Sequence, residues 1–302
     1  MFVDVEEEFD WFAPLDRAQR ATTAMRAFPD AHRRFNAWGV PLACMIDYPI
    51  ARDPVSVDIL RAVTADGRSE IGTQLHAWVN PPHDEEPTRA NSYAGNLPFD
   101  LEAAKLDRLT DAITHAFGRA PRAFRAGRYG IGPHTPALLA ARGYRLDSSV
   151  RAHHDYRADG GPDFRAIGNP AYRTTGLIEL PLTTIFTGFA RVGGERAYRV
   201  LGRVPNGRGL AARLGALSRI SLTPEGMPIA DALRAVDAAV ADGQRILAFS
   251  FHSPSLCPGH TPYVRTAADL ARFWNWWATM LARLDRLGVR AASLDEVIAA
   301  AG

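Results

Sequence analysis

Residues 246–253 read Ile-Leu-Ala-Phe-Ser-Phe-His-Ser, an apolar run that ends in a polar pair, His252 and Ser253. Six earlier apolar runs along the chain also deliver polar residues where they end. Amphipathic segments of helical period lie between the runs. This alternation predicts β-α units and a parallel sheet, in which the carboxyl ends of the strands meet at one edge.

The polar residues at the seven run ends are the first candidates for a functional site. If the sheet closes into a barrel, their side chains converge on one rim. Residues 289–291 are the expected eighth and closing strand. We therefore expect a (β/α) barrel of seven to eight parallel strands, in a single domain over residues 1–302. The candidates at the rim are Asp4, Glu6, Asp47, Gln74, His76, Arg125, Arg128, Asp147, Thr183 and His252.

Several connecting helices can be located from the spacing of their apolar residues. Helices are expected around residues 106–117, 135–141, 233–240 and 267–287, and Ser293 with Glu296 forms a capping box that opens a last helix. Three stretches, 80–98, 151–173 and 188–224, lack this rhythm. We expect them to be long loops above the rim, where such loops build substrate clefts.

Composition excludes several classes of function. The 35 Lys and Arg residues are scattered among 33 acids, with a formal net charge of +2 and no basic stripe, so we expect no nucleic-acid partner. The two cysteines, Cys44 and Cys257, lie in different units and suggest neither a disulfide nor a thiolate metal site. No apolar stretch reaches the roughly 18 residues of a membrane span, and the first strand begins at Phe2. These features lead us to expect a cytoplasmic protein.

Five segments, taken in order, resemble the motif series of a known enzyme family. They are 2–6 (FVDVE), 70–76 (EIGTQLH), 124–130 (FRAGRYG), 146–149 (LDSS) and 251–254 (FHSP). The chain is thereby similar to the polysaccharide deacetylases, the NodB-homology family also called carbohydrate esterase family 4. Residues 75–82 (LHAWVNPP) and 91–98 (NSYAGNLP) resemble its divergent WalW-like branch.

The resemblance implies a distorted (β/α) barrel and metal-assisted hydrolysis of an N-acetyl group on an amino sugar. It implies that Asp4 is the base that takes a proton from water and that Arg125 holds this base. It further implies that Asp147 orients His252 and that His252 protonates the leaving amine. The chemistry is sound without the family, because amide hydrolysis needs a base, a charge to stabilise the oxyanion and an acid for the nitrogen. A carboxylate beside His252 would raise its pKa and keep it charged near neutrality.

The metal site departs from the family pattern. Gln74 and Trp78 stand where that pattern has two histidines, and His76 is the histidine left nearby. Glu6 and His76, with Gln74 or Asn80, are the candidate ligands of a divalent ion, zinc or similar. A site without metal, in which Arg125 or Arg128 polarises the carbonyl, stays open. The other acids of the run 6–10, Glu7 and Glu8 among them, are expected in a solvated loop.

The remaining expectations concern the substrate. Trp78, Tyr129 and Arg128 are candidate substrate-binding residues, although Arg128 is also compatible with neutralising a surface acid and Asp147 with capping a turn beside Ser148. The sequence favours a hydrolase of carbon–nitrogen amide bonds, acting on a carbohydrate or another N-acetylated small molecule. The alternatives are a non-catalytic carbohydrate-binding barrel and a metal-independent amidohydrolase on a small amide. The oligomeric state is left open.

Overall fold

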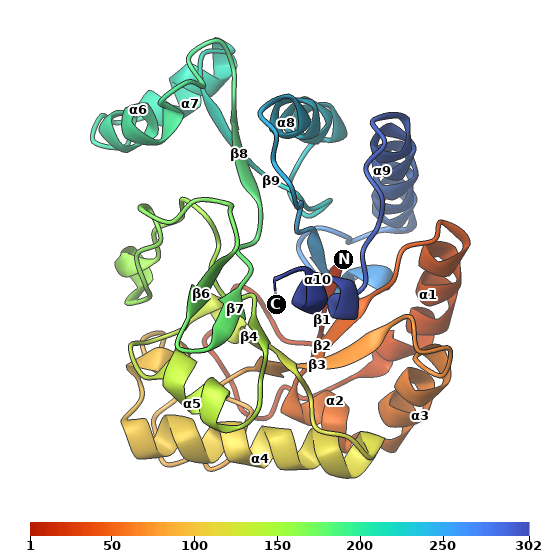
Figure 1. Cartoon of the computed structure of the whole chain (residues 1–302). Coiled ribbons are helices and arrows are strands. Elements are labelled where there is room, and N and C mark those ends of the chain that lie inside the picture. The colour runs from red at the N-terminus through yellow and green to blue at the C-terminus, as the bar shows by residue number, and fades with distance from the viewer. Residues whose placement is uncertain (302) are drawn as a thin grey trace.

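The computed structural model describes residues 1–301, in which eight strands form one curled sheet (Figure 1). The strand order is β10-β1-β2-β3-β4-β5-β7-β6. The first seven strands of this order run parallel, and β6 pairs antiparallel with β7 at the edge. The predicted parallel sheet of β-α units is therefore confirmed. The strands are β1 (Phe2–Val5), β2 (Ala43–Ile46), β3 (Glu70–Leu75), β4 (Ala123–Ala126), β5 (Leu146–Asp147), β6 (Tyr172–Thr174), β7 (Leu177–Glu179) and β10 (Ser250–His252).

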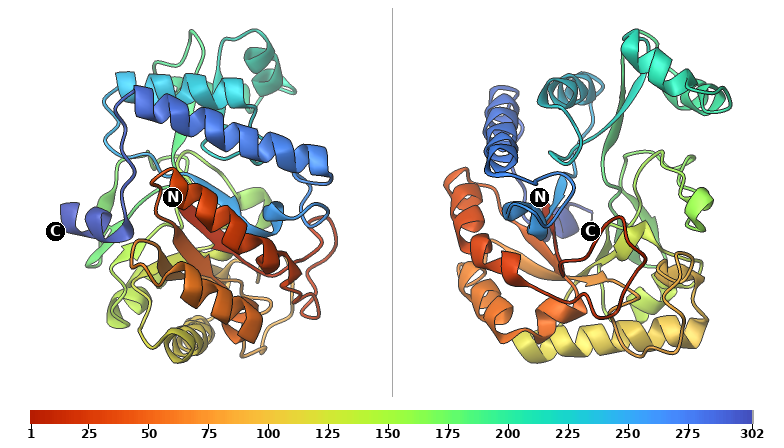
Figure 2. Two further views of the ribbon diagram at one scale, coloured as in Figure 1. Left: turned by 90° about the vertical axis from the view of Figure 1, so that its right-hand side faces the viewer. Right: turned by 180° about the vertical axis from the view of Figure 1, so that it is seen from behind.

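Helices cover the outer face of the sheet (Figures 1 and 2). The predicted helices are present, with α4, α5, α8 and α9 matching the apolar stripes and α10 opening on the capping box of Ser293 and Glu296. The helices are α1 (Phe28–Ala37), α2 (Tyr48–Arg52), α3 (Pro54–Val63), α4 (Phe99–Phe117), α5 (Thr135–Ala141), α6 (Gly194–Leu201), α7 (Gly207–Arg213), α8 (Ile229–Ala241), α9 (Ala267–Arg286) and α10 (Leu294–Ala300). No helix in the described chain is both long and apolar enough to cross a membrane.

The alternation of side chains along each strand separates two hydrophobic cores. Val3 and Val5 of β1 belong to the outer core between the sheet and the helices, whereas Phe2 belongs to the core inside the curl of the sheet. Leu294 of α10 packs into that inner core. Asp4, on the same side of β1 as Phe2, therefore points into the interior.

The predicted closing strand is wrong. Residues 289–291 link α9 to α10 without joining the sheet, and the backbone N–H of Val289 instead donates to Leu284 at the end of α9. The gap between β7 and β10 is crossed by other segments. Ala248 exchanges hydrogen bonds with Thr183, and the backbone N–H of Ser250 donates to Leu222. With that gap filled, the side of β10 that faces it is not free for residues 289–291.

The stretches without helical rhythm are only partly irregular. Residues 80–98 contain a single short 3₁₀ turn (Ala94–Asn96), and residues 151–173 end in the edge strand β6. The third stretch holds the helices α6 and α7. These two helices connect strand β8 (Thr184–Thr187) to strand β9 (Ser218–Ser221), which form a separate antiparallel ribbon.

Candidate active site

Asp4, Arg125 and His252 meet at the carboxyl ends of β1, β4 and β10. Arg125 Nη1 donates a hydrogen bond to Asp4 Oδ1 at 2.8 Å, and His252 Nε2 lies 3.7 Å from Asp4 Oδ2. Asp4 faces His252 in the register of the two neighbouring strands, which accounts for the second contact. Asp4 and Arg125 are buried, so water screens their charges only weakly. The predicted convergence of these three side chains is confirmed.

Glu225 holds the far side of His252. Its Oε2 lies 2.7 Å from His252 Nδ1, its Oε1 accepts the backbone N–H of His252 at 3.1 Å, and Ser255 Oγ donates to the same Oε1. Burial alone would lower the pKa of His252, but the carboxylates of Glu225 and Glu6 outweigh it and raise that pKa well above its usual value. The raised pKa favours the protonated imidazole, in which the Nδ1–H donates to Glu225 and the Nε2–H faces Asp4.

Asp147 does not hold His252, and the predicted contact between them is wrong. Its Oδ1 accepts hydrogen bonds from the backbone N–H and the hydroxyl of Ser149, and its neighbour across the sheet is Glu179 on β7. Burial raises the pKa of Asp147 to about 6. The carboxylate thus caps its own turn, as the alternative interpretation expected, with Ser149 in place of Ser148. The position against His252 is taken by Glu225.

His76 is surrounded by three buried carboxylates. Its Nδ1 lies 2.8 Å from Glu7 Oε2 and 3.9 Å from Asp47 Oδ2, and its Nε2 lies 3.5 Å from Glu6 Oε2. The backbone N–H of Glu7 also donates to Asp47 at 2.8 Å. The prediction that Glu7 is solvated is wrong, because the chain turns inward after β1 and buries it fully. Glu8 is engaged as well, since it accepts the backbone N–H of Ala24.

This cluster suits a divalent cation. One ligand atom each from Glu7, Asp47 and His76 lie within 4.8 Å of one another, and oxygen with imidazole donors is a set that zinc and similar ions accept. Burial raises the pKa of Glu6 and of Glu7 to about 7. The surrounding protein therefore offers these two carboxylates too little positive charge to offset the cost of burying them. Glu6 Oε1 is moreover buried without a hydrogen-bond partner. The residues therefore fit a cation.

The ligand set differs from the predicted one. His76 is common to both, but Glu7 and Asp47 replace Glu6 at the imidazole nitrogen Nδ1. Glu6 faces the other nitrogen and accepts a hydrogen bond from Gln74 Nε2 at 3.0 Å. Asn80, the other predicted ligand, directs its amide to the carbonyls of Pro81 and Lys105.

The ring of His76 is closely packed. Trp78 stacks on it with ring centroids 4.3 Å apart, and the backbone of Gly127 lies close to its edge atom Cδ2. A side chain at position 127 would place its Cβ only 2.3 Å from His76 Cδ2, so glycine is required there. Trp78 itself is 2% exposed. The predicted sugar-stacking role of Trp78 is therefore wrong, because its ring supports His76 and offers no open face.

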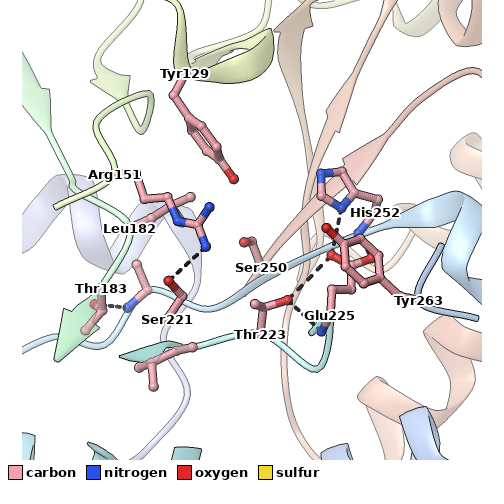
Figure 3. A pocket seen from close by; sticks show the side chains of 12 residues that line it. Tyr129, Arg151, Leu182, Thr183, Ser221, Thr223, Glu225, Ser250, His252 and Tyr263 are labelled. Carbon is pink, nitrogen blue, oxygen red and sulfur yellow. Dashed lines mark hydrogen bonds and ion pairs between the residues drawn. The ribbon is translucent and has the colours of Figure 1, made fainter. Parts of the chain in front are cut away.

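A cavity of about 50 Å³ lies beside His252 (Figure 3). This is about the room of one or two water molecules, enough for a group as small as an acetyl. Tyr129 lines the cavity, and Arg151 donates to Ser221 at 2.8 Å in its wall. The lining residues are Tyr129, Arg151, Leu182, Thr183, Ser221, Leu222, Thr223, Glu225, Ala248, Ser250, His252 and Tyr263.

Arg128 is not part of this cavity. Its guanidinium lies over the ring of Tyr93 at 4.7 Å from the centroid and donates to the hydroxyls of Ser92 and Tyr93, with Asp159 at 3.3 Å. The predicted contact of Arg128 with a substrate stays a prediction. The alternative interpretation, that Arg128 neutralises an acid, describes its contact with Asp159.

Solved structures of related shape were found, whereas no family model and no curated protein matches the sequence. A protein named as a polysaccharide deacetylase from Mycobacterium smegmatis is 17% identical with a TM-score of 0.51, over 92% of this chain and 76% of that one. A protein named as a glycoside hydrolase/deacetylase from Parabacteroides distasonis is 14% identical with a TM-score of 0.58, over 96% and 66%. The chain has the polysaccharide deacetylase fold. The branching enzyme of type GH57 from Pyrococcus horikoshii is also similar, at 12% identity and a TM-score of 0.51, over 100% and 70%.

Within this deacetylase fold, the residues that sequence reasoning missed come from segments without a clear pattern. Glu225 lies between β9 and α8, just past the stretch 188–224 that was expected to be a loop, and Arg151 and Tyr263 also reach the cavity from loops. Asp47 and Glu7 did carry a signal. Both are acids within two residues of the end of a buried strand, the position that also pointed to Asp4 and His252.

Proposed function

We propose that this protein hydrolyses the amide bond of an N-acetyl group on an amino sugar or glycan precursor. The observation that supports this activity is the placement of Asp4 between Arg125 and His252, with Glu225 behind the histidine. A fixed carboxylate and a charged imidazole on adjacent strands supply the base and the acid of amide hydrolysis. The cavity beside His252 offers room for the acetyl group.

The residues divide the reaction as follows. Asp4 accepts a proton from water while the water oxygen forms a bond to the carbonyl carbon. His252 then donates its Nε2 proton to the amide nitrogen as the carbon–nitrogen bond breaks, which releases acetate and the free amine. Each proton transfer contributes about 10²- to 10⁴-fold in rate. Arg125 keeps Asp4 in place, and Glu225 keeps His252 charged and oriented.

A divalent cation fits this scheme. Glu7, Asp47 and His76 would hold it, next to Glu6 and close to the base. When bound, it would polarise the carbonyl and stabilise the oxyanion. The predicted cytoplasmic location would present soluble or lipid-linked precursors to the enzyme, in preference to finished wall polymer.

A carbohydrate-binding barrel without catalysis is the second candidate. The observation that favours it is the hydrogen bond from Gln74 to Glu6. The amide of Gln74 thereby takes up a carboxylate oxygen of Glu6, close to the proposed base Asp4. In that case sugars would bind in the cavity and no acetate would be released. A metal-independent amidohydrolase would release product in the presence of a chelator.

Acetate release from a panel of N-acetylated amino sugars, with and without chelator, tests the proposal. We expect release by the unmodified protein and loss of at least about 100-fold in D4N and in H252A. D10N is the matched control, because Asp10 is exposed on the loop that follows β1. Unchanged turnover in D4N or H252A would contradict the assigned roles. Sugar binding without acetate release would favour the binding barrel.

A further inference from the structure

Residues 188–217, here called the arm, project from the body of the protein (Figures 1 and 2). The arm contains α6 and α7 and connects the two strands of the β8–β9 ribbon. At the other end of that ribbon, Ser221 and Thr223 line the cavity beside His252. A strand of four residues is about 13 Å long, so the arm begins close to the candidate active site.

Large apolar side chains are exposed on the arm. Six of the twelve large hydrophobic residues that are exposed in residues 1–301 belong to this short segment, with Phe189 at 82% and Val192 at 90%. Most proteins do not gather exposed apolar side chains in this way unless the surface meets a partner. The six are Phe189, Val192, Val200, Val204, Leu210 and Leu214.

The arm is also strongly basic. Residues 188–217 contain six arginines and a single acid, Glu195. The expectation that basic residues are scattered evenly among acids is therefore wrong for this part of the chain. Arg196, Arg203 and Arg213 are exposed and have no acidic partner among residues 1–301.

Basic and apolar side chains share the same outer faces of the two helices. On α6, Arg196 and Val200 are four residues apart, and Arg203 lies two residues past the end of the helix. On α7, Leu210 is followed by Arg213, and Leu214 comes directly after the helix. Residues at these spacings lie on one side of a helix. Each exposed stripe therefore combines guanidinium groups with aliphatic groups.

The exposure does not come from a disordered segment. The ring of Tyr198 is held between the guanidinium groups of Arg208 and Arg219, at 4.4 and 4.9 Å from its centroid. Arg191 pairs with Asp242 just after α8, which fixes the arm to the body. The arm is thus folded, and its apolar side chains still point outward.

We infer that the arm docks on an anionic lipid surface. Arginines carry the charge and the planar fork that bind lipid phosphates, and the aliphatic and aromatic side chains between them suit the boundary between headgroups and acyl chains. The nearly complete absence of acids matches a negatively charged surface. Docking would bring the cavity close to the headgroups. This inference does not depend on the proposed activity.

Cosedimentation of the full chain with vesicles tests the inference. We expect binding to vesicles of phosphatidylcholine and phosphatidylglycerol in equal parts, and little binding to phosphatidylcholine alone. The variant R196Q/R203Q/R213Q should bind roughly 100-fold more weakly, since each arginine near an anionic surface contributes about fivefold. The variant F189S/V192S/L214S should lose at least about tenfold.

Two control variants separate the arm from general effects. R33Q/R89Q/R290Q removes the same charge from exposed positions elsewhere, and V55S/F99S removes exposed apolar groups elsewhere. Both should bind within about twofold of the unmodified protein. No binding to the anionic vesicles, equal binding to neutral vesicles, or equal losses in the control variants would overturn the inference. Self-association through the arm in place of vesicle binding, or binding to nucleic acid that competes with vesicles, would also overturn it.

Discussion

Glu225 Oε2 lies 2.7 Å from Nδ1 of His252, and this carboxylate gives the histidine both its orientation and its charge. Because Nδ1 donates to Glu225, the opposite nitrogen presents an N–H toward Asp4. A neutral imidazole could not supply a proton to a leaving amine. The pair therefore accounts for the raised pKa of His252 and for the side of its ring that faces Asp4, 3.7 Å away.

E225Q should move the alkaline limit of activity to lower pH. Catalysis needs His252 protonated, so activity is lost as pH rises through the raised pKa of His252. Removal of the Glu225 charge lowers that pKa, and activity at neutral pH should fall at least about tenfold. The pH dependence of kcat/KM for acetate release measures the effect.

D147N is the matched control for E225Q, because sequence alone pointed to Asp147 as the partner of His252. Asp147 is engaged with Ser149 and Glu179, so D147N should leave the alkaline limit in place. A shift in D147N of the same size as in E225Q would contradict the assigned partner.

Much of the fold was predictable from the sequence, because the local pattern of apolar and polar residues indicates which side chains are buried. The apolar run 246–253 and its six counterparts became the seven parallel strands, and their last residues included Asp4, Arg125 and His252. Strands that point alternate side chains inward leave a signal of this kind in the sequence.

The residues that were missed depend on contacts made across long stretches of chain. Glu225 is 27 residues from His252, and it comes from a turn that no periodicity marks. Glu7 was expected in water because acids in a run normally are, yet the loop after β1 folds back onto His76. Residues 289–291 resemble a strand, but the edge they would need is already bridged by Thr183 and Leu222.

Loss of Arg125 should destabilise the protein strongly. Arg125 and Asp4 are both buried and joined by a 2.8 Å hydrogen bond, so R125M leaves the buried Asp4 carboxylate without that donor and with the 3.7 Å contact to His252 as its remaining ion pair. Removing one partner of a buried pair costs about 3–5 kcal/mol. Urea unfolding measures the free energy, and D4N added to R125M should recover part of the loss because it removes the buried charge.

The control for this stability change is R33M. Arg33 pairs with Asp30 on the surface, where such pairs contribute about 0–1 kcal/mol. A loss in R125M no larger than the loss in R33M would show that the buried pair does not stabilise the fold.

Zinc should bind to the cluster around His76. We expect stoichiometric metal by elemental analysis and a higher midpoint of thermal unfolding when zinc is added, because a ligand that binds only the folded state stabilises it. H76A, E7Q and D47N should each lose most of this metal and of the thermal shift. E8Q is the control, since Glu8 belongs to the same acidic run but contacts Thr23 and Ala24.

A histidine in place of Gln74 should also change zinc binding. Q74H should bind zinc more tightly, because it removes the amide from Glu6 and adds an imidazole beside it. Metal content that is unchanged in H76A, E7Q and D47N would place any bound ion elsewhere in the protein.

Trp11 should contribute to substrate binding. Its ring meets the ring of His252 with centroids 5.0 Å apart and that of Tyr263 at 5.7 Å, so it packs against two residues that line the cavity while remaining only partly buried. W11A should raise KM roughly five- to tenfold with a smaller change in kcat, as expected when an aromatic contact made equally in the ground and transition states is lost. F12A is the control, because Phe12 is 80% exposed and makes no ring contact with the site. Steady-state acetate release measures both variants, and a fall in kcat with KM unchanged in W11A would instead give Trp11 a role in positioning His252.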